Sequence, residues 1–174
     1  RISFEVGMNQ LGGHPIYITE KEIELGKRET ISDAARVLSR YVSMIVIRTF
    51  SHWDVVELAR YATVPVINGL TDLLHPCQIA ADIFTIYEKK KKFENLIIAY
   101  VGDGNNVANS WLELSQRIPM ELRIGTAKET MPDGKILRDA VNSKISKILV
   151  TSDPVEAVKN ADVIYTDVWA SMGQ

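Results

Sequence analysis

The sequence predicts an α/β protein with two doubly wound parallel-sheet domains, helices on both faces of each sheet and an active-site cleft between the domains. Apolar strand-like segments alternate with helix-like segments along nearly the whole chain. Two of the strand segments, 44–49 and 95–101, are continuous apolar runs, as expected for parallel strands covered on both faces. The charged segment 88–94 separates two such alternations, so we predict one domain over residues 1–90 and another over 91–174.

In the first half, hydrophobic periodicity distinguishes helices from strands. Ser32 and Asp33 are good N-cap residues for one helix, and Thr71 or Asp72 for the long helix that follows. The lysines that end this long helix suit the negative pole of its dipole. We predict helices over 2–12, 31–41, 52–62 and 77–92, strands over 15–18, 44–49 and 64–68, and a polar loop over 24–30.

In the second half the same alternation continues. Asp153 is expected to cap the last helix, with Pro154 in its first turn. We predict strands over 95–101, 120–127, 147–152 and 162–168, a turn over 102–106, and helices over 107–118, 133–145 and 153–161.

The composition is that of an ordinary globular protein. The chain has 174 residues, 46% of them hydrophobic, and a net charge of −2, so no nucleic-acid partner is expected. The short basic run Lys89–Lys92 is interpreted as a solvated helix end. No apolar run approaches the roughly 20 residues that span a bilayer, so no membrane partner is expected. The chain starts without Met inside a helical pattern and stops just after a strand, so we expect a piece of a longer protein.

Several polar side chains follow the carboxyl ends of the predicted strands, which is where ligands bind in open α/β sheets. These residues are Arg48, His75, Gln78, Asn105, Asn106 and Asp167. An arginine that ends an apolar strand needs an anionic partner, which is either a neighbouring carboxylate or a bound phosphate or carboxylate. Asn105 and Asn106 are either turn formers or amides that bind a carboxylate. Asp167 either caps the following turn or binds an ammonium group with the help of Ser171.

The stretch His75-Pro76-Cys77-Gln78 contains the only cysteine of the chain. His75 is either a capping or core histidine or a ligand-binding group. No metal is expected, because no second ligand lies at a suitable spacing from His75. Cys77 lacks a complete set of activating groups and is interpreted as a small buried apolar residue.

The turn "GDGNN" over 102–106 has some similarity to a dinucleotide-binding loop. The third glycine of that pattern is replaced by Val107, and the next strand ends without an acidic residue for a ribose. A dinucleotide-binding domain therefore remains only as an alternative.

Six segments in order resemble the ornithine carbamoyltransferases: "RISFEVGMNQLGG", "ELGKRETISDAARVLSRY", "IRTFSH", "VPVINGLTDLLHPCQIAAD", "GDGNNVANS" and "YTDVWASMGQ". The HPxQ tetrapeptide is shared with aspartate carbamoyltransferases, whereas "DVWASMG" marks the ornithine branch. Transfer from carbamoyl phosphate to the side-chain amine of L-ornithine is implied, giving citrulline and phosphate without cofactor or metal. The resemblance also implies arginine metabolism, a cytoplasmic location and homotrimers or assemblies of trimers.

The resemblance assigns roles to individual residues. It implies that Arg48 and His75 are catalytic and polarise the carbamoyl carbonyl. The implied carbamoyl phosphate ligands are Arg1, Arg48, His75 and Gln78, and those of ornithine are Asn106, Asp167, Ser171 and Met172.

The chain also departs from the family pattern. The first four residues of the family's Ser-Thr-Arg-Thr-Arg phosphate loop and its His-Cys-Leu-Pro segment are not in the sequence, so we expect the 174-residue chain alone to be inactive. Glu24 stands where many members carry glutamine. Aspartate and acetylornithine carbamoyltransferases are the alternatives within the family, but the charge of Asp167 disfavours an aspartate substrate.

Overall fold

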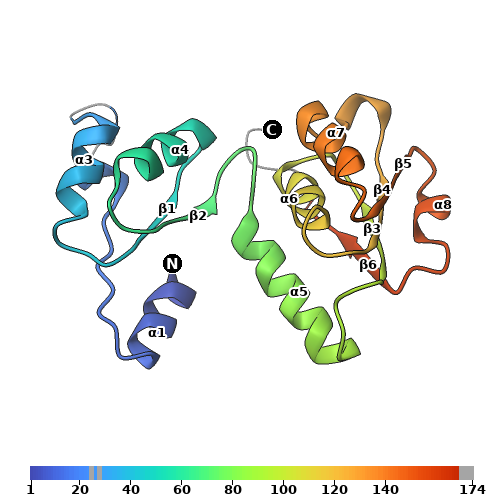
Figure 1. Cartoon of the computed structure of the whole chain (residues 1–174), viewed down its shortest axis with the longest axis horizontal. Coiled ribbons are helices and arrows are strands. Elements are labelled where there is room, and N and C mark those ends of the chain that lie inside the picture. The colour runs from blue at the N-terminus through green and yellow to red at the C-terminus, as the bar shows by residue number, and fades with distance from the viewer. Residues whose placement is uncertain (24–25, 27–28, 169–174) are drawn as a thin grey trace.

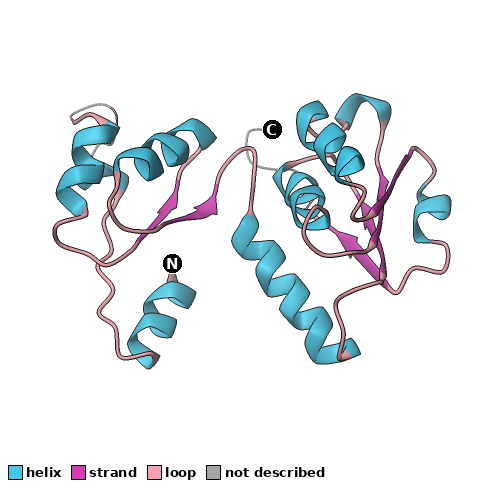
Figure 2. Cartoon of the chain, viewed as in Figure 1, coloured by secondary structure: helices cyan, strands magenta, loops and turns pink. Residues whose placement is uncertain are grey.

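The computed structural model describes residues 1–23, 26 and 29–168, and it confirms the α/β class (Figures 1 and 2). In the first lobe the elements are α1 (Ile2–Gln10), α2 (Glu20–Ile23), α3 (Ile31–Leu38), β1 (Ile45–Arg48), α4 (His52–Tyr61) and β2 (Val66–Leu70). The long helix α5 (Pro76–Lys90) then leads into the second lobe. This lobe contains β3 (Ile97–Val101), α6 (Asn106–Ser115), β4 (Glu121–Gly125), the 3-10 turn η1 (Lys128–Thr130), α7 (Gly134–Ser143), β5 (Lys147–Thr151), α8 (Pro154–Val158) and β6 (Val163–Thr166).

The first lobe is built on a parallel pair of strands, β1 and β2, in which Ile45 is opposite Val66. Helices α3 and α4 pack on one face of this pair through Ile31, Ala35 and Leu58. Val46 and Arg48 point to the other face and are exposed. The first sheet is therefore covered by helices on one face only among the described residues.

The predicted strand at 15–18 is wrong, because this segment has no regular secondary structure. Its apolar side chains remain exposed, and its backbone makes no hydrogen bond to another described residue. A strand needs a neighbouring strand to accept and donate its hydrogen bonds, and a local apolar pattern does not show whether one exists.

The second lobe is a four-stranded parallel sheet in the order β5-β4-β3-β6. Helices α5, α6 and α7 cover one face, and the short helix α8 covers the other (Figure 1). The side chains between the sheet and the three helices form one apolar core. Its fully buried side chains include Leu96, Ile98, Tyr100, Trp111, Leu112, Leu122 and Ile124.

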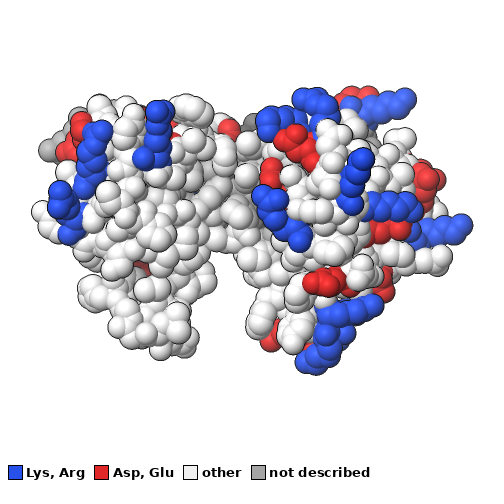
Figure 3. Space-filling view, viewed as in Figure 1, with Lys and Arg blue, Asp and Glu red and all other residues white. Residues whose placement is uncertain are grey.

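Helix α5 packs with the second lobe, although it lies within the predicted first domain. Ile79 and Ile86 on α5 belong to the same apolar cluster as the β3 and β4 side chains. The division at residue 90 stays a prediction. On the face shown in Figure 3 a notch separates the lobes, and charged side chains are concentrated on the second one.

Two predicted helix caps are wrong. The N-cap of α3 is Thr30, two positions before Ser32 of the predicted Ser32–Asp33 pair, because its Oγ1 accepts the Asp33 N–H at 3.1 Å. The N-cap of α5 is His75, which makes no side-chain capping bond, and Pro76 fills the first turn. Proline has no backbone N–H, so Pro76 needs no hydrogen-bond acceptor at the start of the helix. A polar capping side chain is therefore not required there, and none marks the start of α5 in the sequence. The Asp153 cap of α8 is confirmed.

We predict that Thr30→Ala destabilises the complete protein that contains this chain by about 1 kcal/mol, because the substitution leaves the Asp33 amide without its acceptor. Urea unfolding measures this change. Ser32→Ala is the matched control and should change the unfolding free energy by less than about 0.5 kcal/mol. A larger loss for Ser32 than for Thr30 would contradict the observed cap.

Candidate active site

The strand order places two polar residues at one point of the second sheet. β4 and β5 follow β3 on one side, whereas β6 returns to its other side. The chain therefore leaves β3 toward β4 on one side and returns to β6 on the other side. In open α/β sheets, ligands usually bind beyond the carboxyl ends of two strands at such a point. Here the Asn105 Nδ2 donates to Asp167 Oδ2 at 2.7 Å.

Asn105 and Asp167 are held in place by further bonds. Asn105 is the N-cap of α6, and its Oδ1 accepts from the amides of Val107 and Ala108. Asp167 Oδ1 accepts from the Val168 amide at 2.8 Å, and the two alternatives for Asp167, a turn cap or an ammonium ligand, both stay predictions. The other carboxylate oxygen of Asp167, Oδ2, is the one that accepts from Asn105.

Polar side chains on α6 hold the loop over residues 71–75. The three hydrogen bonds join Asn106 Nδ2 to Thr71 O at 2.7 Å, Asn109 Nδ2 to Leu73 O at 3.2 Å, and the His75 amide to Ser110 Oγ at 2.7 Å. They satisfy backbone groups that would otherwise be buried without partners. Asn106 is thus a structural contact of this loop in the described structure, and its predicted role toward ornithine stays a prediction.

His75 lies at the start of α5, half-buried, and its Nδ1 is buried without a hydrogen-bond partner among the described residues. Burial and the Arg48 charge lower the pKa of His75, against opposing effects of Asp167 and Asp82. A lowered pKa keeps the imidazole neutral at neutral pH, with one ring nitrogen as donor and the other as acceptor. His75 Nδ1 therefore keeps a hydrogen-bonding capacity that the described residues do not use.

Arg48 ends β1 at a register irregularity between Ile47 and itself. Such a bulge redirects the side chain that follows it. Arg48 is exposed and forms no ion pair with another described residue, so the salt-bridge alternative is not what the structure shows. The Arg48 charge lowers the pKa of His75, and the catalytic roles of the two residues stay predictions.

Gln78 lies one turn into α5 and donates from Nε2 to Asp82 Oδ1 at 2.9 Å. Asp82 and Tyr165 were not among the predicted site residues, yet each lies beside this group. The i, i+4 spacing of Gln78 and Asp82 on one helix is a signal that was available in the sequence. Tyr165 had no comparable signal, because only the strand order brings β6 to α5.

Arg1 makes different contacts from those predicted. Its Nε donates to Glu5 Oε2 at 3.0 Å, and its guanidinium lies 4.0 Å from the centroid of the Tyr17 ring. Its role in phosphate binding stays a prediction. Ser171, Met172 and Glu24 lie outside the described residues.

Cys77 is a packed thiol. Its Sγ donates to the Asn68 carbonyl at 3.3 Å, and burial raises its pKa. A raised pKa disfavours the thiolate that a nucleophile or metal ligand requires.

No group of three His, Cys, Asp or Glu side chains is placed to hold a metal ion in the part of the chain that the structure describes. Within the same ranges, no helix is both long enough and apolar enough to cross a membrane.

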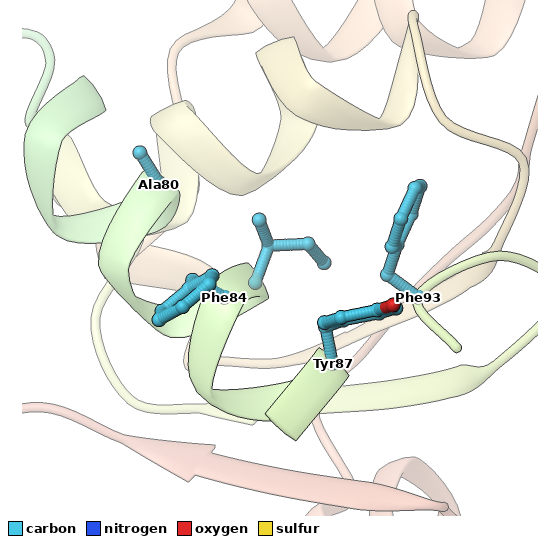
Figure 4. Close-up of a pocket in the computed structure, with 5 residues that line it drawn as sticks. Ala80, Phe84, Tyr87 and Phe93 are labelled. Atoms are coloured by element: carbon cyan, nitrogen blue, oxygen red, sulfur yellow. The ribbon is translucent and has the colours of Figure 1, made fainter. Parts of the chain in front are cut away.

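An apolar hollow on α5 lies apart from the polar crevice (Figure 4). It is lined by Ala80, Ile83, Phe84, Tyr87 and Phe93. The rings of Tyr87 and Phe93 are 6.0 Å apart between centroids. This hollow offers no charged group to an anion, so the candidate site is the polar group that includes His75 and Asp167.

The dinucleotide alternative is disfavoured by the turn over 102–106. A Cβ on Gly104 would lie 2.1 Å from Pro132 N and 2.4 Å from Met131 C, so this glycine serves a close approach between two segments of the chain. The first amides of α6 are also already bonded to Asn105. The turn therefore has no free surface of the kind that receives a pyrophosphate.

The family follows from the comparisons. Residues 1–88 match the model described as aspartate/ornithine carbamoyltransferase, carbamoyl-P binding domain, and residues 94–174 match the Asp/Orn binding domain. The chain belongs to the aspartate/ornithine carbamoyltransferase family. This confirms the predicted resemblance. The carbamoyl-P binding model of the family covers Arg48, His75 and Gln78, and its Asp/Orn binding model covers Asn106 and Asp167.

Individual members of this carbamoyltransferase family are similar over the whole chain. The ornithine carbamoyltransferase of Syntrophus aciditrophicus is 55% identical over 174 residues, with 100% of this chain and 58% of that protein covered. The chloroplastic ornithine carbamoyltransferase of Pisum sativum is 52% identical, with 100% and 46% covered. The ornithine carbamoyltransferase structure from Pyrococcus furiosus has a TM-score of 0.92 at 50% identity, with 100% and 56% covered. The chain thus spans about half the length of these relatives.

We predict that Gly104→Ala destabilises the protein by at least about 1–3 kcal/mol, since the methyl group meets backbone atoms that cannot move independently. Thermal and urea unfolding provide the measurement. Gly7→Ala on α1 is the control, because nothing lies within 4 Å of its added Cβ. Equal effects of the two substitutions would contradict the close packing at Gly104.

We also predict that His75 titrates below about 6.5, the ordinary histidine value, and that Arg48→Met raises the pKa of His75 by removing a nearby positive charge. NMR titration of the imidazole measures both. Arg138→Met on α7 is the control and should leave the pKa of His75 unchanged. If Arg48→Met has no effect either, the two side chains do not interact.

Proposed function

We propose that the complete protein that contains this chain transfers the carbamoyl group of carbamoyl phosphate to the side-chain amine of L-ornithine, giving L-citrulline and phosphate. The electrostatic coupling of His75 to both Arg48 and Asp167, with Asp167 bonded to Asn105, supports the proposal. It joins groups suited to an anion and groups suited to an ammonium ion. The names of the similar proteins support the same reaction.

The reaction requires stabilisation of an oxyanion. The neutral amine attacks the carbamoyl carbon, a C–N bond forms, and the carbonyl oxygen gains negative charge before the C–O bond to phosphate breaks. The amine loses a proton in the process. Arg48 donates from a permanent cation, and neutral His75 donates from one ring nitrogen to that oxygen. Donors already positioned where charge develops are typically worth about 3 kcal/mol each.

The phosphate end is assigned to Arg1 together with Arg48. Arg1 now pairs with Glu5, but this ion pair is largely exposed, with 58% of the Arg1 side chain accessible. Exposed ion pairs contribute little free energy, so a phosphate that Arg1 binds more strongly can replace Glu5. Gln78 is assigned to the carbamoyl group.

The amino-acid end is assigned to the second lobe. Asp167 binds the α-ammonium group with Ser171, and Asn106 and Met172 bind the carboxylate. The carboxylate of Asp167 attracts the cationic groups of ornithine and repels the second carboxylate of aspartate. Ornithine is therefore favoured over aspartate.

We further propose a role in arginine metabolism, a cytoplasmic location and a homotrimer or an assembly of trimers. The first lobe supports the assembly with exposed apolar side chains on α1 and in the segment after it, including Leu11, Ile16 and Tyr17. Light scattering of the complete protein determines the oligomeric state.

The proposal predicts citrulline formation from carbamoyl phosphate and ornithine, and different defects in the two half-sites. Arg48→Ala should lower kcat by about 100-fold or more and weaken carbamoyl phosphate binding. Asp167→Ala should mainly raise the KM for ornithine, because it removes the counter-ion of the ammonium group. Steady-state assays with each substrate varied in turn measure these effects.

Arg40→Ala and Glu88→Ala, at exposed positions, are the matched controls and should retain full activity. Identical effects of Arg48→Ala and Asp167→Ala on both substrates would contradict the division of the site. Equal rates with ornithine and with other amines would overturn the substrate assignment.

A further inference from the structure

Gln78 and Asp82 form a pair on α5, on the side of the helix where Asp82 interacts with Tyr165 of β6. Gln78 Nε2 donates to Asp82 Oδ1 at 2.9 Å. The two residues are one helical turn apart, so the bond lies along the helix and needs no distortion of α5. Both side chains are partly buried, which shields the bond from water.

This bond determines which end of the Gln78 amide is left for a ligand. An ionised carboxylate only accepts hydrogen bonds, so the NH₂ end of the amide must face Asp82. The carbonyl Oε1 of Gln78 then points away from Asp82. An acceptor is what the NH₂ group of carbamoyl phosphate requires.

Asp82 is held by more than Gln78. The Tyr165 hydroxyl from β6 is near enough for each group to shift the pKa of the other, and His75 and Asp167 also act on Asp82. Tyr165 is itself fixed, because its ring stacks on Tyr100 at 5.8 Å and meets the edge of Trp111 at 5.9 Å. The Asp82 side chain on α5 therefore interacts with a Tyr165 side chain on β6 whose ring is held by its two aromatic neighbours.

The carboxylate of Asp82 is costly to ionise at this position. Its Oδ2 is buried, and the interactions with Gln78 and Tyr165, which lower the pKa of Asp82, offset that burial only in part. Burial raises the pKa of Asp82, so the folded state holds its proton more tightly than the unfolded state does. Stability then falls as the pH rises from the unfolded pKa through the folded one, and the ionised group destabilises the fold at neutral pH.

We propose that Asp82 is a positioning residue that orients the Gln78 amide, so that Oε1 accepts a hydrogen bond from the carbamoyl NH₂. This pair selects carbamoyl phosphate over acyl phosphates that carry a methyl group in place of NH₂. The inference rests on the proposed carbamoyl transfer. Asp82 acts through Gln78 and does not itself touch the substrate.

The test uses Asp82→Asn, Gln78→Ala and the double variant in the complete protein. An asparagine can donate as well as accept, so it no longer dictates the orientation of Gln78. We expect Asp82→Asn to raise the KM for carbamoyl phosphate by about tenfold, as for one lost hydrogen bond, with the KM for ornithine unchanged. The double variant should be no worse than Gln78→Ala, since Asp82 acts through Gln78.

Acetyl phosphate is the second probe, as a competitive inhibitor that lacks the NH₂ group. Its inhibition constant should stay the same in Asp82→Asn, so the preference for carbamoyl phosphate falls by about the same tenfold. Glu88→Gln, an exposed carboxylate-to-amide change on the same helix, is the control and should alter neither value. The thermal midpoint of Asp82→Asn at pH 7 should be unchanged or higher.

Additive losses in the double variant, or equal weakening of acetyl phosphate and carbamoyl phosphate, would overturn the inference. If Asp82→Asn does not fold, Gln78→Ala alone decides, because an unchanged preference between the two phosphates would also overturn it. Failure of the unmodified protein to form citrulline is a separate result, which rejects the proposed function itself.

Discussion

The hydrogen bonds between α6 and the loop over residues 71–75 are the constraint on which the candidate site depends. Asn106, Asn109 and Ser110 are buried polar residues on one helix, and each bonds to a backbone group of the loop. Without them the loop would carry unsatisfied polar atoms into a partly buried position, which costs about 1–3 kcal/mol per group. This bonding sets the position of His75 relative to the second sheet.

The same constraint explains why α5 packs where it does. His75 begins α5, so a loop anchored on α6 directs the helix along the second sheet, where Ile79 and Ile86 join the core. The polar face of α5 then meets the end of β6, which places Asp82 beside Tyr165. Groups assigned to the phosphate half and to the amino-acid half thereby come within electrostatic reach of one another.

Local patterns identified most of the elements, and the errors have a common cause. The periodicity over 77–92 and the apolar run over 95–101 correspond to α5 and β3, within a few residues at each end. The apolar segment 15–18 was mistaken for a strand because its neighbours in space are not visible in a local pattern. The cap of α3 differed for a related reason, since several adjacent polar residues can serve and the fold selects one, whereas α5 begins at Pro76 without any side-chain cap.

The sequence by itself determined the α/β class, the alternation of elements and the set of polar residues that follow strands, including Arg48, His75 and Asp167. These properties depend on neighbours along the chain. Only the tertiary structure decided that β6 lies beside β3, that Asn105 therefore bonds Asp167, and that Asp82 shares the crevice. Strand order and helix packing arise from contacts between residues far apart in the sequence, where a local pattern has no information.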